Sequence, residues 1–259
     1  MAELSVCTYN VRHRRENPQI KNDIFKLIDH GAEVICLQEM GGHEGALQNL
    51  PHLWNYYMPS AAGNDGGRSD TPILYKIDKL KFHAADSRHV SPPTTVEEGS
   101  GGSTIPEKTI TVVRCHHRQT DASIVFMNTH ALPTIDDNGH PHNPRRMKLF
   151  GMLMDTMQTM VRNHNKEGSL SIFCGDLNVD FENDRRVGDH DFPYYKMNQV
   201  DMRSSFQHLG SLPGSEGNRL IDYVCHSVDK RITPIEQVRI ENTGGDHSPI
   251  LVKYQIDKG

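Results

Sequence analysis

Apolar, strand-like runs that carry polar side chains at one end are the feature that most constrains this fold. The clearest run is Leu-Ser-Ile-Phe-Cys at 170–174, which leads directly into Gly175-Asp176-Leu177-Asn178. Four other runs share this arrangement: 4–9 before Asn10, 34–37 before Gln38 and Glu39, 124–127 before Asn128, Thr129 and His130, and 249–254 after Asp246 and His247. Strand ends that present carboxylates, carboxamides and imidazoles indicate a metal-assisted phosphoester site rather than a packed core.

Strand-like and helix-like segments alternate along the chain, which predicts an α/β fold. A helix is expected over 18–30, with Pro18 in its first turn and Gly31 at its end. A longer helix over 143–166 carries an apolar stripe that we expect to pack in the core. The other expected elements are short helices over 43–52 and 197–209 and strands over 5–11, 34–39, 54–58, 72–77, 80–89, 108–118, 123–129, 170–174, 220–226, 236–242 and 249–256.

The segment 91–106 is rich in Pro, Gly, Ser and Thr and is expected to form a long exposed loop or flap. Strands are predicted on both sides of it, so it is a poor domain boundary. A chain of 259 residues is long enough to bury one large core. We therefore expect a single domain over 1–259, built as a layered sandwich in the order helix, sheet, sheet, helix.

Charge and composition limit the kinds of protein that fit. The net charge is −5, from 28 Lys and Arg against 33 Asp and Glu, which argues against tight clamping of nucleic acid through many phosphate contacts. A nuclease is not excluded, because carboxylates that serve a metal ion would add to the negative charge. The five cysteines lie in strand-like runs without CxxC spacing, as expected for buried reduced thiols. Most of the 16 histidines, His13 among them, are scattered and are assigned no role.

The sequence contains no apolar run that approaches the length needed to cross a membrane. The first predicted strand begins too early for a signal peptide to precede it. A cytoplasmic location is therefore expected. The pattern does not decide the oligomeric state, and a monomer is the simplest expectation.

The order of the polar motifs resembles that of the endonuclease/exonuclease/phosphatase superfamily, and in particular its deoxyribonuclease I-like members. The motifs are Asn10 within Thr-Tyr-Asn-Val-Arg, Gln38-Glu39, Asn128-Thr129-His130, Gly175-Asp176-Leu177-Asn178, Ile221-Asp222-Tyr223 and Asp246-His247-Ser248-Pro249. Each motif alone is weak, but together they span residues 5 to 254. The resemblance implies a four-layer α/β sandwich of two mixed β-sheets packed face to face and flanked by helices. It also implies Mg²⁺-dependent hydrolysis of a phosphoester by in-line attack of water.

The metal ligands implied by the resemblance supply oxygen atoms. Mg²⁺ prefers oxygen ligands and keeps several of its waters, so one or two carboxylates suffice to hold it. Glu39 is the leading ligand, and Asn10 is expected to add a carbonyl oxygen or to donate its amide to phosphate. Asp246 is expected to contribute to the metal region. Mn²⁺ is expected to substitute for Mg²⁺.

Five residues are expected to carry the reaction. Asp176 resembles the family residue that orients or deprotonates the attacking water, and Asn178 would hold that water and a phosphate oxygen. His247 matches the histidine that hydrogen-bonds the phosphoryl oxygens or transfers a proton, and Asp222 matches the acid that orients its ring. His130 places the chain with the histidine-containing branch of the family rather than with the exonuclease III type.

Four further residues are weaker candidates. Asp70 precedes the predicted strand 72–77 and is a candidate partner of His130. Arg68, and either Arg145 or Arg146 at the start of the long helix, are candidates for contact with phosphate. Exposed arginines at such positions are at least as often plain surface charge.

The motifs do not identify the substrate. The family that the chain resembles cleaves DNA, RNA tails, inositol phosphates and sphingomyelin with one shared site, so the loops decide the substrate. A nuclease or general phosphodiesterase, with nucleic acid as its partner, is the favoured interpretation. The alternatives are a small-molecule or lipid phosphoesterase, of the sphingomyelinase or phosphoinositide-phosphatase kind, and a catalytically silent binding module. The intact set of polar positions disfavours the silent module.

Overall fold

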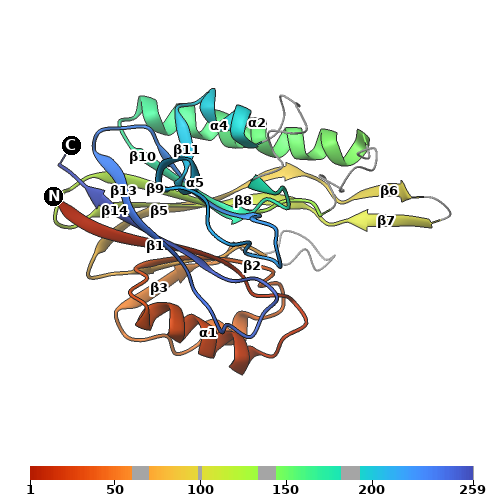
Figure 1. The fold of residues 1–259 in the computed structure, drawn as a ribbon, viewed down its shortest axis with the longest axis horizontal. Coiled ribbons are helices and arrows are strands. Elements are labelled where there is room, and N and C mark those ends of the chain that lie inside the picture. The colour runs from red at the N-terminus through yellow and green to blue at the C-terminus, as the bar shows by residue number, and fades with distance from the viewer. Residues whose placement is uncertain (60–69, 99–100, 134–143, 182–192, 259) are drawn as a thin grey trace.

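The computed structural model describes residues 1–259 except 60–69, 99–100, 134–143, 182–192 and 259. Within the described residues, two six-stranded sheets pack face to face, and a separate two-stranded hairpin projects from them (Figure 1). Sheet A has the order β13-β14-β1-β2-β4-β3 and contains β1 (Ala2–Asn10), β2 (Val34–Gln38), β3 (Trp54–Tyr57), β4 (Ile73–Lys76), β13 (Ile232–Arg239) and β14 (Ile250–Ile256). Sheet B has the order β11-β12-β10-β9-β8-β5 and contains β5 (Leu80–Ser91), β8 (Lys108–His117), β9 (Ser123–His130), β10 (Leu170–Asp176), β11 (Met202–Ser204) and β12 (Asp222–Ser227).

Both sheets are mixed, and the parallel pairs determine where the polar strand ends meet. In sheet A, β1 runs parallel to β2, which aligns Asn10 with Gln38. In sheet B, β10 runs parallel to β9, which aligns Asp176 with His130. The antiparallel partner β12 begins at the same edge, with Asp222 opposite Asp176. Strand direction therefore brings the polar ends of several strands to one edge of each sheet.

Two helices cover the outer faces of the sheets (Figure 1). On the side of sheet A, α1 (Asn17–Asp29) begins at a capping box of Glu16 and Gln19 and buries apolar residues spaced three or four apart, namely Ile20, Ile24 and Leu27. On the side of sheet B, α2 (Pro144–Lys166) buries the predicted apolar stripe, which includes Phe150, Met154, Met157 and Val161. The four layers confirm the predicted fold class.

The largest apolar core fills the space between the two sheets and continues between sheet B and α2. It contains Leu4, Val6, Phe126, Phe173 and Val224, which are all fully buried. All five cysteines are also buried, with free thiols. Within the described residues, no helix is long and apolar enough to cross a membrane.

The predicted loop at 91–106 is wrong. The chain there forms β6 (Thr94–Glu98) and β7 (Gly101–Ile105), an antiparallel hairpin that extends beyond β5 and β8 (Figure 1). Its Pro, Gly and Ser content indicated a loop, but the β-branched residues Thr94, Thr95, Thr104 and Ile105 favour strands. Pairing of the two strands also satisfies backbone groups that an extended loop would leave to water.

The predicted helices over 43–52 and 197–209 are also wrong in extent. The first is a single 3₁₀ turn, η1 (Glu44–Leu47), after which Asn49 adopts a positive φ and Pro51 follows. The second is divided into α4 (Pro193–Asn198), β11 and α5 (Ser205–Leu209). Ser204 accepts a hydrogen bond from Gln207 N and thereby begins a new helix, while β11 pairs with β12. Capping and strand pairing thus outweigh the helical pattern.

Candidate active site

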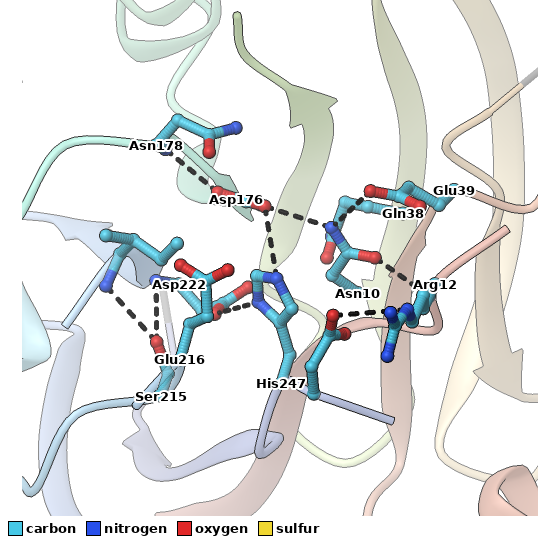
Figure 2. Close-up of polar contacts among 12 residues, drawn as sticks. Asn10, Arg12, Gln38, Glu39, Asp176, Asn178, Ser215, Glu216, Asp222 and His247 are labelled. Atoms are coloured by element: carbon cyan, nitrogen blue, oxygen red, sulfur yellow. Dashed lines mark hydrogen bonds and ion pairs between the residues drawn. The ribbon is translucent and has the colours of Figure 1, made fainter. Parts of the chain in front are cut away.

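The candidate site lies where the polar ends of the two sheets face each other (Figure 2). Glu39 and Asn178 both have positive φ, of 59° and 54°, so the chain turns sharply just after β2 and β10. Gly175 lies one residue before Asp176, and a Cβ at that position would lie 2.3 Å from the Thr129 carbonyl oxygen. Glycine therefore lets β10 approach β9 closely enough to place Asp176 beside His130.

Asn10 joins carboxylates from the two sheets. Its Nδ2 donates to Glu39 Oε1 at 3.1 Å and to Asp176 Oδ2 at 2.9 Å (Figure 2). Asn10 and Asp176 are each only 1% exposed. One amide group thus holds two acidic side chains, one from sheet A and one from sheet B, on either side of a common point.

His130 faces the same two carboxylates. Its Nε2 lies 3.9 Å from Glu39 Oε1 and 3.7 Å from Asp176 Oδ2. Its Nδ1 is 3.0 Å from Asp70 Oδ2, which fixes the orientation of the ring. Burial favours the neutral form of Asp70, but the hydrogen bond and charge of His130 outweigh it and lower the pKa of this carboxyl group. The structure therefore places Asp70, His130, Glu39 and Asp176 in one continuous cluster.

The turn after β10 orients the Asp176 carboxylate. The Asn178 backbone N–H donates to Asp176 Oδ1 at 2.8 Å, which leaves Oδ2 facing Asn10, His130 and His247. Burial and the negative charge of Asp222 raise the pKa of Asp176, despite the opposing effects of the histidines and Asn10. A carboxylate with a raised pKa is a better proton acceptor than an ordinary surface acid.

Asp222 and His247 form a buried pair on the other side of Asp176. His247 Nδ1 is 2.8 Å from Asp222 Oδ2, and its Nε2 is 3.9 Å from Asp176 Oδ2 (Figure 2). Burial alone would lower the pKa of His247, but the charge and hydrogen bond of Asp222, with the charge of Asp176, raise it to about 10. Ser215 Oγ in turn accepts hydrogen bonds from the backbone N–H of Asp222 and of Ile221. The geometry thus supports a cationic ring held toward the site.

Two groups of side chains are possible metal sites. Asp176, Asp222 and His247 offer ligand atoms within 4.8 Å of one another, but His247 Nδ1 and Asp222 Oδ2 already bond each other at 2.8 Å. The carboxylate of Glu39, which lies opposite Asp176 across Asn10, offers oxygen atoms. Such a set of oxygen donors suits a hard divalent cation such as Mg²⁺ or Mn²⁺. The side of the site that includes Glu39 and Asn10 therefore fits the metal better.

Asp246 lies beside this region but is paired with an arginine. Arg12 Nε is 3.2 Å from Asp246 Oδ2, and both side chains are partly exposed. The Arg12 backbone N–H donates to Asn10 Oδ1 at 3.0 Å. In this arrangement the Asn10 oxygen faces the backbone, and its amide nitrogen faces the carboxylates. The role of Asp246 and Asn10 as metal ligands stays a prediction.

His13 also belongs to the site, although no role was predicted for it from the sequence. Its backbone N–H and its Nδ1 lie 2.8 Å and 2.9 Å from Glu39 Oε2. Burial of Glu39 favours the neutral acid, but these contacts and the charge of His130 lower its pKa. The signal in the sequence was the position of His13, which lies on the loop after β1, three residues beyond the polar end of that strand.

A buried cluster that the sequence analysis also missed anchors two loops of the site. Arg15 Nη1 donates to Asp23 Oδ2 at 2.6 Å and to Tyr9 Oη at 2.9 Å. Tyr9 Oη and the Gly244 N–H donate to the same oxygen of Asp23. Arg15 belongs to the loop after β1, and Gly244 belongs to the loop that carries Asp246 and His247. Asp23 on α1 therefore ties both loops to one helix.

The three arginine candidates for phosphate contact lie in different settings. Arg146 is 7% exposed and donates from Nη1 to the Pro133 carbonyl oxygen at 2.9 Å. It therefore stabilises the start of α2 rather than standing free for a ligand. Arg145 is exposed at the same helix start. Arg68 lies outside the described residues.

Paired carboxylates, a hydrogen-bonded acid and histidine, and a four-layer sandwich together define a metal-dependent phosphoric ester hydrolase. The sequence model of the Endonuclease/Exonuclease/phosphatase family matches residues 7–247. The chain belongs to this family, whose members are metal-dependent phosphoric ester hydrolases. The predicted relationship to the deoxyribonuclease I-like superfamily is thereby confirmed. No curated protein matches the sequence.

Solved structures show the same fold at low sequence identity. An endonuclease/exonuclease/phosphatase family protein from Bacteroides thetaiotaomicron has a TM-score of 0.71 and 15% identity, covering 98% of this chain and 95% of that one. TDP2 from D. rerio, complexed with a single-strand DNA product, has a TM-score of 0.68 and 15% identity, covering 98% and 100%. A mannosyl-6-phosphatase from B. thetaiotaomicron has a TM-score of 0.69 and 16% identity, covering 97% and 99%. These similarities establish the fold.

Glu39→Gln tests the assignment of the metal side. The change keeps the shape of the side chain but removes the charge that would attract a divalent cation. We expect the Mg²⁺ concentration that gives half-maximal activity to rise by at least about tenfold. Glu44→Gln, the same change at an exposed residue of η1, is the matched control and is expected to behave like the wild type. An unchanged metal dependence in a folded Glu39→Gln variant would remove Glu39 from the metal site.

Proposed function

We propose that the chain is a Mg²⁺- or Mn²⁺-dependent nuclease that hydrolyses phosphodiester bonds of DNA or RNA. The observation that carries the hydrolytic part is the placement of Glu39, Asp176 and His247 around one point, joined by Asn10 and by Asp222. Anionic and cationic groups on opposite sides suit a phosphate that must be both bound and attacked. The nucleic-acid part rests on the charge of the neighbouring loop.

In this proposal Asp176 orients the attacking water and accepts its proton, because its Oδ2 faces the site and its pKa is raised. His247 donates from Nε2 to a phosphoryl oxygen, and Asp222 keeps the ring charged and oriented. The Asn178 side chain, on the turn after Asp176, is assigned to a phosphate oxygen. Glu39 would hold a divalent cation, which would supply positive charge for the phosphate and make water more acidic.

The loop that connects β1 to α1 supplies positive charge at the edge of the site. It reads Arg12-His13-Arg14-Arg15, and its path is held by the Asp246 pair of Arg12 and the Asp23 pair of Arg15. Arg14 is exposed, and within the described residues it makes no hydrogen bond or ion pair. A free cation beside a phosphodiester site favours a substrate with more than one phosphate, such as an oligonucleotide.

The alternative is a phosphoesterase for small molecules. One of the similar structures is named a mannosyl-6-phosphatase, and its TM-score of 0.69 is close to the 0.68 of TDP2 complexed with a DNA product. The net charge of −5 also favours a small substrate over a long polyanion. The two proposals differ in whether charge outside the reacting phosphate matters.

A comparison of substrates decides between them. We expect single-stranded DNA or RNA oligonucleotides to be cleaved with a kcat/KM well above that for bis(p-nitrophenyl) phosphate, mannose 6-phosphate or sphingomyelin. Arg14→Gln should lower kcat/KM for the oligonucleotide several-fold and reduce the slope of log kcat/KM against log salt by about 0.7, as for one lost phosphate contact. The same variant should cleave bis(p-nitrophenyl) phosphate with the kcat/KM of the wild type.

The matched control is Arg162→Gln. Arg162 is also exposed, but it lies near the end of α2 that leads into the start of β10, away from the site edge. Arg162→Gln is expected to leave kcat/KM for both substrates, and its dependence on salt, unchanged. A preference for mannose 6-phosphate or sphingomyelin, with no effect of Arg14→Gln, would favour the small-molecule or lipid alternative.

A further inference from the structure

A buried hydrogen-bond network joins the two sheets directly beneath the candidate site. Asn128 on β9 of sheet B donates from Nδ2 to the Leu37 carbonyl oxygen at 2.7 Å and to the Pro72 carbonyl oxygen at 3.0 Å. Its Oδ1 accepts from Gln38 Nε2 at 2.7 Å. Leu37 and Gln38 belong to β2, and Pro72 immediately precedes β4, so all three partners belong to the side of sheet A. Asn128 and Gln38 are completely buried.

Each partner in this network is close in sequence to a residue of the site. Gln38 precedes Glu39, Asn128 lies two residues before His130, and Pro72 lies two residues after Asp70. Gln38 Nε2 also lies 3.1 Å from Thr8 Oγ1, and Thr8 lies two residues before Asn10. The network therefore contacts residues that lie within two positions of Glu39, Asp70 and Asn10 in the sequence.

The two sheets share no strand within the described residues, so ladder hydrogen bonds do not fix one sheet relative to the other. Apolar packing between them is strong but has little directional preference. Other polar contacts also cross the gap between the sheets, among them Thr71 Oγ1–Thr111 Oγ1 at 2.8 Å and, within the site itself, Asn10 Nδ2–Asp176 Oδ2 at 2.9 Å. Asn128 is the residue that makes three directional bonds across it.

We propose that Asn128 is a positioning residue that sets the Glu39 half of the site against the Asp176 and His130 half. It acts through Leu37, Gln38 and Pro72 rather than by contact with the substrate. Because Glu39 and Asp176 come from different sheets, a small shift between the sheets changes the space between their carboxylates. This inference rests on the proposed function, since it assigns the network to the same site.

Asn128→Leu tests the proposal, because leucine has a similar size and removes all three bonds. Misplacement of reacting groups by about 1 Å can cost about 10²-fold in rate. In the folded Asn128→Leu variant we expect kcat to fall by roughly 10-fold to 10²-fold while KM changes less. Calorimetric titration of the phosphate-free protein with Mn²⁺ should also show weaker binding, which gives a measurement that is independent of turnover.

Two variants separate positioning from general loss of stability. Ser227→Ala removes the buried hydrogen bonds between Ser227 Oγ and the Ser171 backbone, at the edge of sheet B away from the site. It should lower the unfolding midpoint but leave kcat and Mn²⁺ affinity within about twofold of the wild type. Asn128→Asp keeps an acceptor and, as a neutral acid, one donor. Its kcat and Mn²⁺ affinity should lie between those of the wild type and those of Asn128→Leu. It serves as the test variant if Asn128→Leu does not fold.

Wild-type kcat and Mn²⁺ affinity in a folded Asn128→Leu or Asn128→Asp variant would overturn the proposal. A matching loss of kcat in Ser227→Ala would also overturn it, because the effect would then follow stability alone. Failure of the proposed function looks different: the wild type itself would cleave none of the phosphodiesters. In that case the Mn²⁺ titrations of the same variants still decide whether Asn128 positions the two halves.

Discussion

Asp176→Asn is expected to lower kcat by roughly 10³-fold or more while the protein stays folded. General acid–base groups contribute about 10²- to 10⁴-fold, and Asp176 also orients the water in the proposed reaction. The amide keeps the shape of the side chain and an oxygen that can accept from the Asn178 N–H. The amide loses the acceptor for Asn10 Nδ2, but a neutral amide is easier to bury than a carboxylate, so the variant should stay folded.

The measurement is the single-turnover rate on an oligonucleotide, together with circular dichroism and the unfolding midpoint. Asp155→Asn is the matched control, because it makes the same chemical change at an exposed residue of α2 that pairs with Lys196. It is expected to cleave at the wild-type rate. A folded Asp176→Asn variant whose rate lies within about tenfold of the wild type would rule out the assigned role of Asp176.

The His247 and Asp222 pair supports the second large expected effect. His247→Ala removes the cationic donor and should slow hydrolysis by roughly 10²-fold or more, with a smaller change in substrate affinity. Asp222→Ala should cause a comparable loss, because the ring then lacks the partner that lies 2.8 Å from its Nδ1. The double variant should be little worse than His247→Ala alone, since Asp222 acts through the ring.

A double-mutant cycle built from kcat/KM for the four proteins measures this coupling. Asp222 Oδ1 is buried and has no hydrogen-bond partner among the described residues, so the ring is the main charge that compensates this acid. Asp222→Asn is included as a variant that keeps the shape of the side chain. Fully additive losses would mean that Asp222 acts independently of His247, for example by stabilising the start of β12.

Much of the fold could be predicted because buried strands and helices have recognisable patterns of apolar residues in the sequence. β10 is buried throughout and β1 is buried except at Glu3, and both strands are largely apolar. The helix α1 has apolar residues at helical spacing. The polar residues that follow such strands were grouped correctly into one region, since parallel strands end at the same edge. Asn10, Glu39, His130 and Asp176 come together for this reason.

Other features depend on contacts between segments that are distant in sequence. The hydrogen bonds of Asn128 to Leu37 and Pro72 form only when the two sheets pack together. The sequence around Asn128 does not indicate these partners. His13 reaches Glu39 because the loop turns at Arg12, whose φ is 63°, and because His43 Nε2 meets the His13 carbonyl oxygen. The sequence places His13 three residues after the polar end of β1, but it does not show that the chain turns back toward Glu39.

In the proposed reaction, a divalent cation and the Asp176 site together hydrolyse phosphodiester bonds. The most direct test is the initial rate of cleavage of an end-labelled oligonucleotide in Mg²⁺, then in excess EDTA, then with Mg²⁺ restored. Asp176→Asn, purified in parallel, measures any contaminating nuclease. We expect cleavage by the wild type that stops in EDTA, returns with Mg²⁺ and is absent in Asp176→Asn. Undiminished cleavage in excess EDTA, or equal cleavage by both proteins, would contradict the proposed reaction.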